Sequence, residues 1–185
     1  MANEREQIAH AAAALIIECG ITDWQFARRK AARQLGLGER AAMPDRVQLE
    51  AALREYAAVY LTDEQPELLA ELRAEALRWM EQLVEFEPEL TGPLAEDWAY
   101  PGCEIRLELL ADDAKVVEIA LLNHGIEVAH LPERGSGPGT ISLKVDGESG
   151  PVRLVIQDIG QRRNRKRDRV RRKLPELRAV VGKGL

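Results

Sequence analysis

Cysteine, histidine and long apolar runs are all scarce in this chain of 185 residues. The two cysteines, Cys19 and Cys103, are too few and too far apart for a disulfide framework or a cysteine metal cluster. We expect two buried, reduced thiols, which are typical of a cytoplasmic protein. The three histidines are dispersed, and no apolar run approaches the roughly 20 residues of a membrane span. The sequence therefore predicts no membrane segment.

Aromatic residues are also rare, at 4%, whereas 45% of the residues are hydrophobic, so the core has to be mainly aliphatic. Charge is unevenly distributed. The net charge is −5, but the run 162–173 holds nine of the 26 basic residues and only one acidic residue. The rest of the chain holds 17 basic and 30 acidic residues, a net charge of −13. An acidic body followed by a basic run is the asymmetry that a function has to explain.

The first half of the chain has helical periodicity. Capping patterns and spaced apolar residues predict four helices there. These helices begin after Asn3, after Thr22, at Pro44 and after Thr62, and the fourth ends at Pro88. Residues 1–87 are therefore expected to be almost entirely helical.

After Pro88 the pattern changes to that of short strands. Apolar and charged residues alternate over Cys103–Leu110, which is typical of a half-buried strand. A helix capped by Asp112 or Asp113 follows and ends at Gly125. Three further strands are predicted over Ile126–Leu131, Thr140–Val145 and Val152–Ile159, and a hairpin turn at Asp146-Gly147 joins the last two.

Because helices come first and strands later, the sequence predicts an α+β fold, with an N-terminal helical region followed by a small mixed β-sheet with flanking helices. The strand, helix and strand between Glu104 and Leu131 fit a parallel crossover unit. We expect a helical region over residues 1–87, an α/β core over 88–160 and a basic C-terminal tail over 161–185.

Gly92-Pro93 is followed about ten residues later by Glu104-Ile105-Arg106, and through this pattern the stretch from Leu68 to Ile159 resembles the nucleotidyltransferases of the polymerase-beta superfamily. These enzymes carry a glycine followed by a small polar residue and, further along, a strand in which acidic and apolar residues alternate. Gly92 matches the glycine, and Glu104-Ile105 matches the first acid and its apolar neighbour. Pro93 stands where the family has serine or glycine, and Arg106 stands in the place of the second acid.

The resemblance implies a nucleotidyltransferase-like core with a degenerate catalytic motif, a nucleotide as ligand and Mg²⁺ as cofactor. A helical region ahead of such a core is also similar to bacterial proteins that carry this label. The resemblance singles out Glu104 as catalytic candidate and metal ligand, and Gly92, Pro93 and Arg106 as nucleotide-binding candidates. Glu108 and Asp158 join Glu104 as catalytic candidates because they are the further carboxylates on the predicted strands.

Nucleotidyl transfer uses carboxylates that hold divalent cations against the substrate phosphates. Two acids at positions i and i+2 of a strand lie roughly 7 Å apart on one face, which suits such a site. Here Glu104 and Glu108 are four residues apart, and the cationic Arg106 lies between them. A further carboxylate has to come from another strand, where Asp158 is the candidate.

Three interpretations of Glu104, Arg106 and Glu108 stay open. In the first, they form a solvated strand face that pairs with Lys144 or Arg153 on a neighbouring strand. In the second, they hold a metal ion. In the third, they bind a nucleotide or phosphate without transferring it, with Arg106 as the phosphate contact.

Two features favour nucleic acid as a partner. The first is the basic run, which can neutralise several phosphates. Its basic residues are Arg162, Arg163, Arg165, Lys166, Arg167, Arg169, Arg171, Arg172 and Lys173. The alternative for this run is a solvated tail, or an intramolecular partner for the acidic body.

The second feature is the segment Ala31–Leu37, which follows a basic turn of helix and is similar to the start of a helix-turn-helix. The alternative is ordinary helix packing, because the next helix carries Glu50 and Glu55 and is a poor recognition helix. The sequence thus leaves two functions open: a nucleotidyltransferase-like protein that binds a nucleotide, or a non-catalytic accessory protein that binds nucleic acid.

Overall fold

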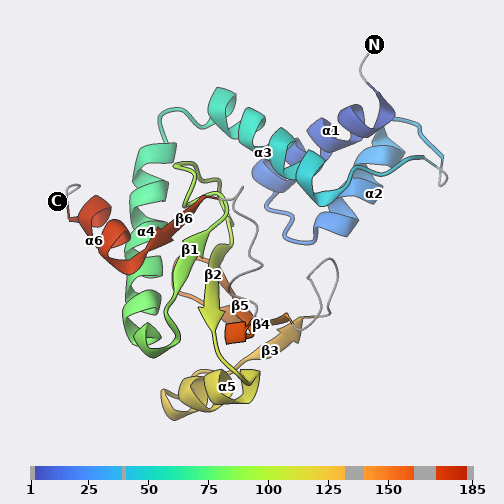
Figure 1. Cartoon of the computed structure of the whole chain (residues 1–185). Coiled ribbons are helices and arrows are strands. Elements are labelled where there is room, and N and C mark those ends of the chain that lie inside the picture. Colours follow the sequence, from blue (N-terminus) through green and yellow to red (C-terminus); the bar gives the residue numbers. More distant parts are fainter. Residues whose placement is uncertain (1–2, 39–40, 132–139, 161–169, 183–185) are drawn as a thin grey trace. The chain divides into compact units, whose positions relative to one another are not determined.

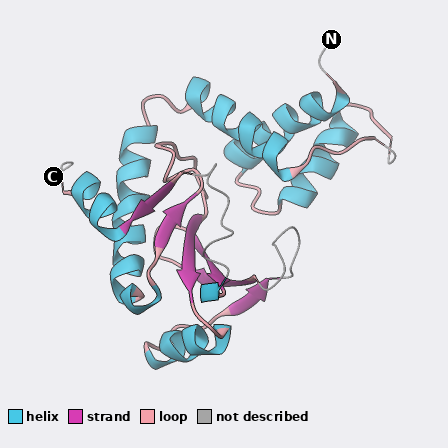
Figure 2. Ribbon diagram, viewed as in Figure 1, coloured by secondary structure: helices cyan, strands magenta, loops and turns pink. Residues whose placement is uncertain are grey.

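The computed structural model of the chain describes residues 3–38, 41–131, 140–160 and 170–182 (Figure 1). The chain divides into two compact units. Unit 1 comprises Met1–Leu68 with Trp98–Gly102, and unit 2 comprises Leu69–Asp97 with Cys103–Leu185. The described residues form six α-helices, mostly N-terminal, and a six-stranded mixed sheet with flanking helices (Figure 2). The predicted α+β fold is confirmed, and the domain boundaries at residues 87 and 160 stay a prediction.

Three helices build unit 1: α1 (Glu4–Cys19), α2 (Trp24–Gln34) and α3 (Arg46–Tyr60). The predicted cap of α1 is confirmed, because the Asn3 backbone N–H donates to the Glu6 carboxylate over 3.1 Å. The cap of α2 was expected at Thr22, but it is Asp23, whose carboxylate accepts from two backbone N–H groups at 2.8 and 3.1 Å. A charged acceptor next to the positive helix end is the stronger cap.

Small residues let the helices of unit 1 pack closely. Ala12 and Ala13 of α1 and Ala27 and Ala31 of α2 are fully buried.

Near the C-terminus of α1, the Tyr56 hydroxyl of α3 donates to the Glu18 carboxylate, and this hydrogen bond raises the pKa of Tyr56 to about 12.

The cysteines agree with the prediction in part. Both are free thiols, and Cys103 is buried. Cys19 is exposed at the last residue of α1, so the expectation of two buried thiols is wrong for this residue.

The helices α4 (Gln65–Gln82), α5 (Ala114–Asn123) and α6 (Leu174–Val181) flank the sheet, and a short 3-10 helix, η1 (Val84–Phe86), follows α4. Asp113 caps α5 through the Lys115 N–H, which settles the choice between Asp112 and Asp113. No helix within the described ranges has both the length and the apolar character that crossing a membrane requires.

The sheet contains strands from widely separated parts of the chain. They are β1 (Glu89–Thr91), β2 (Ile105–Leu110), β3 (Ala129–Leu131), β4 (Ile141–Asp146), β5 (Pro151–Gln157) and β6 (Arg171–Lys173). Their order across the sheet is β3-β4-β5-β2-β1-β6. The central pair β2 and β5 is parallel, and every other neighbouring pair is antiparallel.

The predicted β4–β5 hairpin is confirmed by their antiparallel register. The predicted crossover from Glu104 to Leu131 is correct only in direction. Strands β2 and β3 run parallel, but β5 and β4 lie between them. Two strands that come later in the chain, β4 and β5, therefore separate β3 from β2.

One face of the sheet is apolar and buried. It carries Leu90, Ile105, Leu107, Leu109, Leu143, Val145, Val152, Leu154 and Ile156. Ile141, which was expected to point inward as well, is 36% exposed at the start of β4. The predicted alternation of β2 is confirmed by its three buried apolar residues, so the charged residues of the strand lie on the opposite face.

A buried carboxylate anchors the turn between β4 and β5. Glu75 of α4 is 1% exposed, and its two oxygens accept the backbone N–H groups of Glu148 at 2.7 Å and Ser149 at 2.6 Å. The Trp79 indole N–H also donates to Glu75, over 3.3 Å. A Cβ at Gly147 would lie 2.1 Å from Glu75 Oε1, so only glycine fits there. This anchor fixes the hairpin on α4.

Candidate functional site

Charged side chains gather on the second face of the sheet in unit 2. The register places Glu89 beside Glu108 and Arg106 beside Arg153. We call the following six residues the charged face: Glu89, Glu104, Arg106, Glu108, Arg153 and Arg171. Three carboxylates and three guanidinium groups thus share one surface of β1, β2, β5 and β6.

Glu104 lies one residue before β2 and contacts two arginines. The Arg153 Nε donates to its carboxylate at 2.9 Å, and the Arg106 Nη2 lies 3.9 Å from it. The predicted cross-strand pairing with Arg153 is confirmed. Lys144, the other predicted partner, instead lies 3.9 Å from Asp146. At this end of the charged face, two guanidinium groups and one carboxylate carry a net charge of +1.

A second cluster lies further along the charged face. Glu108 is 6% exposed in its side chain and accepts from the Arg171 Nε at 3.1 Å. The carboxylate of Glu89, opposite Glu108 in the register, lies 3.6 Å from the same nitrogen. Two carboxylates directly across a strand pair repel each other, and Arg171 is the cation they share.

The turn after β1 approaches Arg106 closely. Gly92 has a φ of +74°, and a Cβ at this position would lie 3.0 Å from Arg106 Nη1. Pro93 follows Gly92 and is buried at the start of the turn. Glycine fits here for two reasons, since a side chain would strain the backbone and would press on the guanidinium. The structure therefore brings together Gly92, Pro93 and Arg106, the predicted nucleotide-binding residues.

Two arginines hold the segment that follows this turn. Arg73 of α4, which is buried, donates to the Leu94 carbonyl and to one oxygen of Asp97 at 2.5 Å. Arg172 of β6 donates to the Ala95 carbonyl at 2.9 Å and to the other Asp97 oxygen at 2.6 Å. The hydrogen bond from Arg73 is the main cause that holds the pKa of Asp97 below its ordinary value, and Arg172 adds to it. Asp97 thus joins α4, β6 and the turn.

The lowered pKa of Asp97 makes part of the stability dependent on pH. Because the folded state binds the proton less tightly than the unfolded state, this contribution is present above the ordinary aspartate pKa of about 3.9. It is lost as the pH falls through the lower folded value. We expect the stability difference between the native protein and Asp97→Asn to shrink between about pH 5 and about pH 2 in urea titrations. A difference that stays constant over this range would contradict the assignment.

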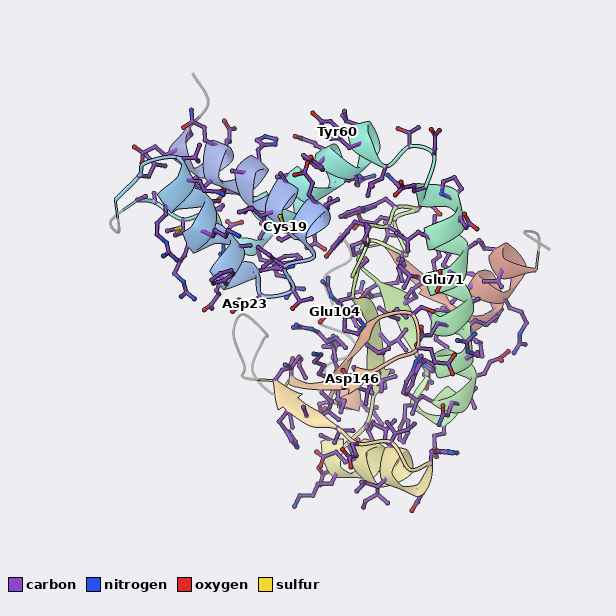
Figure 3. The ribbon with its side chains drawn as sticks, turned by 180° about the vertical axis from the view of Figure 1, so that it is seen from behind. Cys19, Asp23, Tyr60, Glu71, Glu104 and Asp146 are labelled. Atoms are coloured by element: carbon purple, nitrogen blue, oxygen red, sulfur yellow. The ribbon has the colours of Figure 1, made fainter. Side chains whose placement is uncertain are left out.

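The predicted catalytic residues are not brought together. Asp158 follows the end of β5, is exposed and accepts the Gly160 N–H at 2.6 Å. Because β2 and β5 run parallel, Glu104 lies at the opposite end of the strand pair, roughly 20 Å away by strand rise. Asp146 lies at the same end of the sheet as Glu104 but two strands across, with its side chain 96% exposed (Figure 3).

These residues do not fit a two-magnesium centre. Mg²⁺ takes oxygen ligands, and the Glu104 oxygens are already in contact with Arg153 and Arg106. Glu108, four residues along the strand, contacts Arg171. Over the part of the chain that the structure describes, no group of three or more acidic, histidine or cysteine side chains is arranged to hold a metal ion.

The basic run is divided by the structure. Six of its residues, Arg162, Arg163, Arg165, Lys166, Arg167 and Arg169, lie outside the described residues. The last three, Arg171, Arg172 and Lys173, form strand β6. For these three residues the structure agrees with the alternative of an intramolecular partner for acidic residues, because β1 pairs with them and the carboxylates of Glu108 and Asp97 contact two of them.

Glu89 and Arg171 are the members of the charged face that the sequence did not place beside Glu104, and Arg153 was named only as one of two possible pairing partners. The alternation of Val152–Ile159 placed Arg153 on the polar side of its strand, but parity alone does not tell which strand lies beside it. Arg171 gave no strand signal. In comparisons with known proteins, neither a family model nor a curated protein matches the chain. The family is not assigned, and the function has to be inferred from the charged face.

Proposed function

We propose that the protein binds a nucleotide, or another ligand that carries phosphate groups, on the charged face beside Gly92, without transferring a nucleotidyl group. The observation that carries the proposal is the contact between the glycine turn and Arg106. The protein would then share the ligand of the nucleotidyltransferases but not their reaction.

The chemistry of Arg106 and Arg153 supports this proposal. They are neighbours in register on adjacent strands, and their side chains are 14% and 26% exposed. Guanidinium groups bind phosphate through two parallel N–H groups, and such charge-assisted hydrogen bonds are strong where water is partly excluded. Glu104 carries one negative charge between two positive ones, so a phosphate with more than one charge competes well for both arginines.

The charges of the site do not suit the transfer of a nucleotidyl group. In a metal-dependent transferase, carboxylates gather cations that neutralise the charge on the reacting phosphate. Here Arg106 lies between Glu104 and Glu108 and contacts Glu104, so the site already contains its own cation. Arginine supplies positive charge for binding, but it activates no hydroxyl group because its pKa is too high for it to act as a base.

The test is a thermal melting and calorimetric titration with ATP, CTP, GTP and UTP, each with and without Mg²⁺. We expect at least one nucleotide to raise the melting temperature, with or without the metal. Arg106→Gln is expected to bind roughly 10- to 100-fold more weakly, because it loses charge-assisted hydrogen bonds of about 1.5–3 kcal/mol. Arg78→Gln is the matched control, since Arg78 is an exposed arginine of α4 that contacts Glu148.

A pair of glycine variants distinguishes the effect of pressing on Arg106 from the effect of backbone strain. Gly92→Ala and Gly125→Ala both place a side chain at positive φ, +74° and +72°, but a Cβ at Gly125 meets nothing within 4 Å. Only Gly92→Ala should weaken binding. Binding that needs Mg²⁺ and disappears in Glu104→Gln would contradict the proposal in favour of a metal site. Absence of any nucleotide effect, together with salt-sensitive binding of RNA that is indifferent to Arg106, would favour a nucleic-acid-binding function located outside the charged face.

A further inference from the structure

A basic groove in unit 1 takes no part in the proposed function. It has a volume of about 730 Å³ and lies beside α2. Gln25, Arg28, Arg29 and Arg33 line it with hydrogen-bond donors, and Leu37 and Met43 line it with apolar surface. The groove combines positive charge with a small apolar area, which is unusual in a protein whose net charge is −5.

The cations of helix α2 have no acidic partner on the same helix. Helix α2 contains Arg28, Arg29, Lys30 and Arg33 and no acidic residue. Within the described residues, the salt bridges of the protein include none of these four side chains. The positive potential is therefore available to a ligand.

Two of the arginines are held in place by neutral acceptors. Arg28 donates from Nη1 to the Pro44 carbonyl at 2.6 Å and from Nε to the Trp24 carbonyl at 3.3 Å. Arg33 donates from Nε to the Arg29 carbonyl at 3.4 Å. These hydrogen bonds position the guanidinium groups. Because a carbonyl carries no net charge, it does not neutralise their positive charge. Positioned donors lose less entropy when a ligand binds.

The spacing of the donors favours a regular chain of anions. Gln25, Arg29 and Arg33 are four residues apart, so they form one row along α2 with about 5–6 Å between successive Cβ atoms. Arginine has donors and no acceptor, and it matches phosphate oxygens in pairs. A nucleic-acid strand presents one phosphate on each nucleotide at regular intervals, and its sugars and bases offer apolar surface to Leu37 and Met43.

We infer that this groove binds the sugar–phosphate backbone of single-stranded nucleic acid, with Arg29 and Arg33 each contacting one phosphate. The contact does not depend on base sequence, because phosphates carry no sequence information. The predicted helix-turn-helix interpretation placed recognition on the following helix. Here α2 itself makes the contact, and the acidic residues of α3 have no part in it.

The inference is tested by fluorescence anisotropy with a labelled oligothymidylate at several salt concentrations. The full-length chain is used, with the basic residues of 162–169 replaced by glutamine so that the run does not contribute. Arg29→Gln combined with Arg33→Gln is expected to lower the slope of log K against log salt by about 1.4, which is about 0.7 for each phosphate of a single strand. Arg78→Gln combined with Lys115→Gln changes the net charge equally in unit 2 and should leave the slope unchanged.

Two results would overturn the inference. One is a slope that is the same in the α2 double variant and in the control double variant, with the helical content of both confirmed by circular dichroism. The other is displacement of the oligonucleotide by polyglutamate at an equal concentration of negative charge, which would identify an acidic polypeptide as the partner. Loss of slope in the α2 variant alone, with no displacement by polyglutamate, supports nucleic acid.

Discussion

Arg171→Gln is expected to lower the free energy of unfolding by about 3 kcal/mol, because it removes the cation shared by two opposed glutamates. Glu108 is 6% exposed in its side chain, so its charge has little access to water. Glu89 lies directly across from it, and two like charges at this position repel each other. Urea unfolding followed by circular dichroism measures the loss.

A conservative control and a rescue make this prediction specific. Arg178→Gln removes an exposed ion pair with Glu81 and should lose at most about 1 kcal/mol. In the Arg171→Gln background, adding Glu89→Gln removes one of the two repelling charges and should restore part of the stability. If the rescue fails and Arg171→Gln behaves like Arg178→Gln, the charged face is an ordinary solvated surface.

Gly147→Ala is expected to destabilise unit 2 by a similar amount, about 3 kcal/mol, because overpacking and a broken charge-assisted hydrogen bond act together. The new Cβ would lie 2.1 Å from Glu75 Oε1 and 2.5 Å from the Gly150 carbonyl oxygen, which is backbone and cannot move freely. Gly38→Ala is the matched control, since its Cβ would meet nothing within 4 Å. Thermal unfolding of both variants gives the comparison.

A Glu75 variant tests whether the instability of Gly147→Ala comes from contact with the Glu75 carboxylate. Glu75→Ala should itself destabilise the protein, because the N–H groups of Glu148 and Ser149 lose their acceptor. In that background Gly147→Ala should cost less than in the native chain, because Oε1 is no longer in its way. Fully additive losses would show that Glu75 and Gly147 do not act on each other.

The elements that could be predicted from the sequence are those with a local signal. The cap at Asn3 and the alternation of Ile105–Leu110 depend on residues a few positions apart, and the structure confirms both. The β4–β5 hairpin was predicted for the same reason, from a turn between two alternating segments. Local patterns therefore located most of the helices and four of the six strands.

Strands β1 and β6 could not be predicted, because each has only three residues and neither lies in a longer apolar segment, as the equally short β3 does. A run of arginine and lysine is also a poor strand on its own. Arg171 lies in a sheet only because Glu89 and Glu108 supply opposite charge from a distant part of the sequence.

The sequence predicted one part of the candidate site and not the other. The association of Gly92 with Arg106 followed from the motif, and the structure places them in contact. The trio of Glu104, Glu108 and Asp158 is not gathered at one place, because the direction of β5 relative to β2 puts Asp158 at the end opposite to Glu104. That direction depends on the topology of the whole sheet, which no spacing within one strand reveals.

The position of β6 has a consequence for the rate at which unit 2 folds. Thr91 pairs with Arg171, so the last strand of the sheet closes over a very long loop, whereas β4 and β5 pair across a tight turn. Loop-closure entropy delays such non-local pairing, and chains with high contact order fold slowly. Until Arg171 arrives, Glu89 and Glu108 meet without the cation that they share in the folded protein. We therefore expect β6 to dock late in folding and to stabilise the β1–β2 pair when it supplies Arg171.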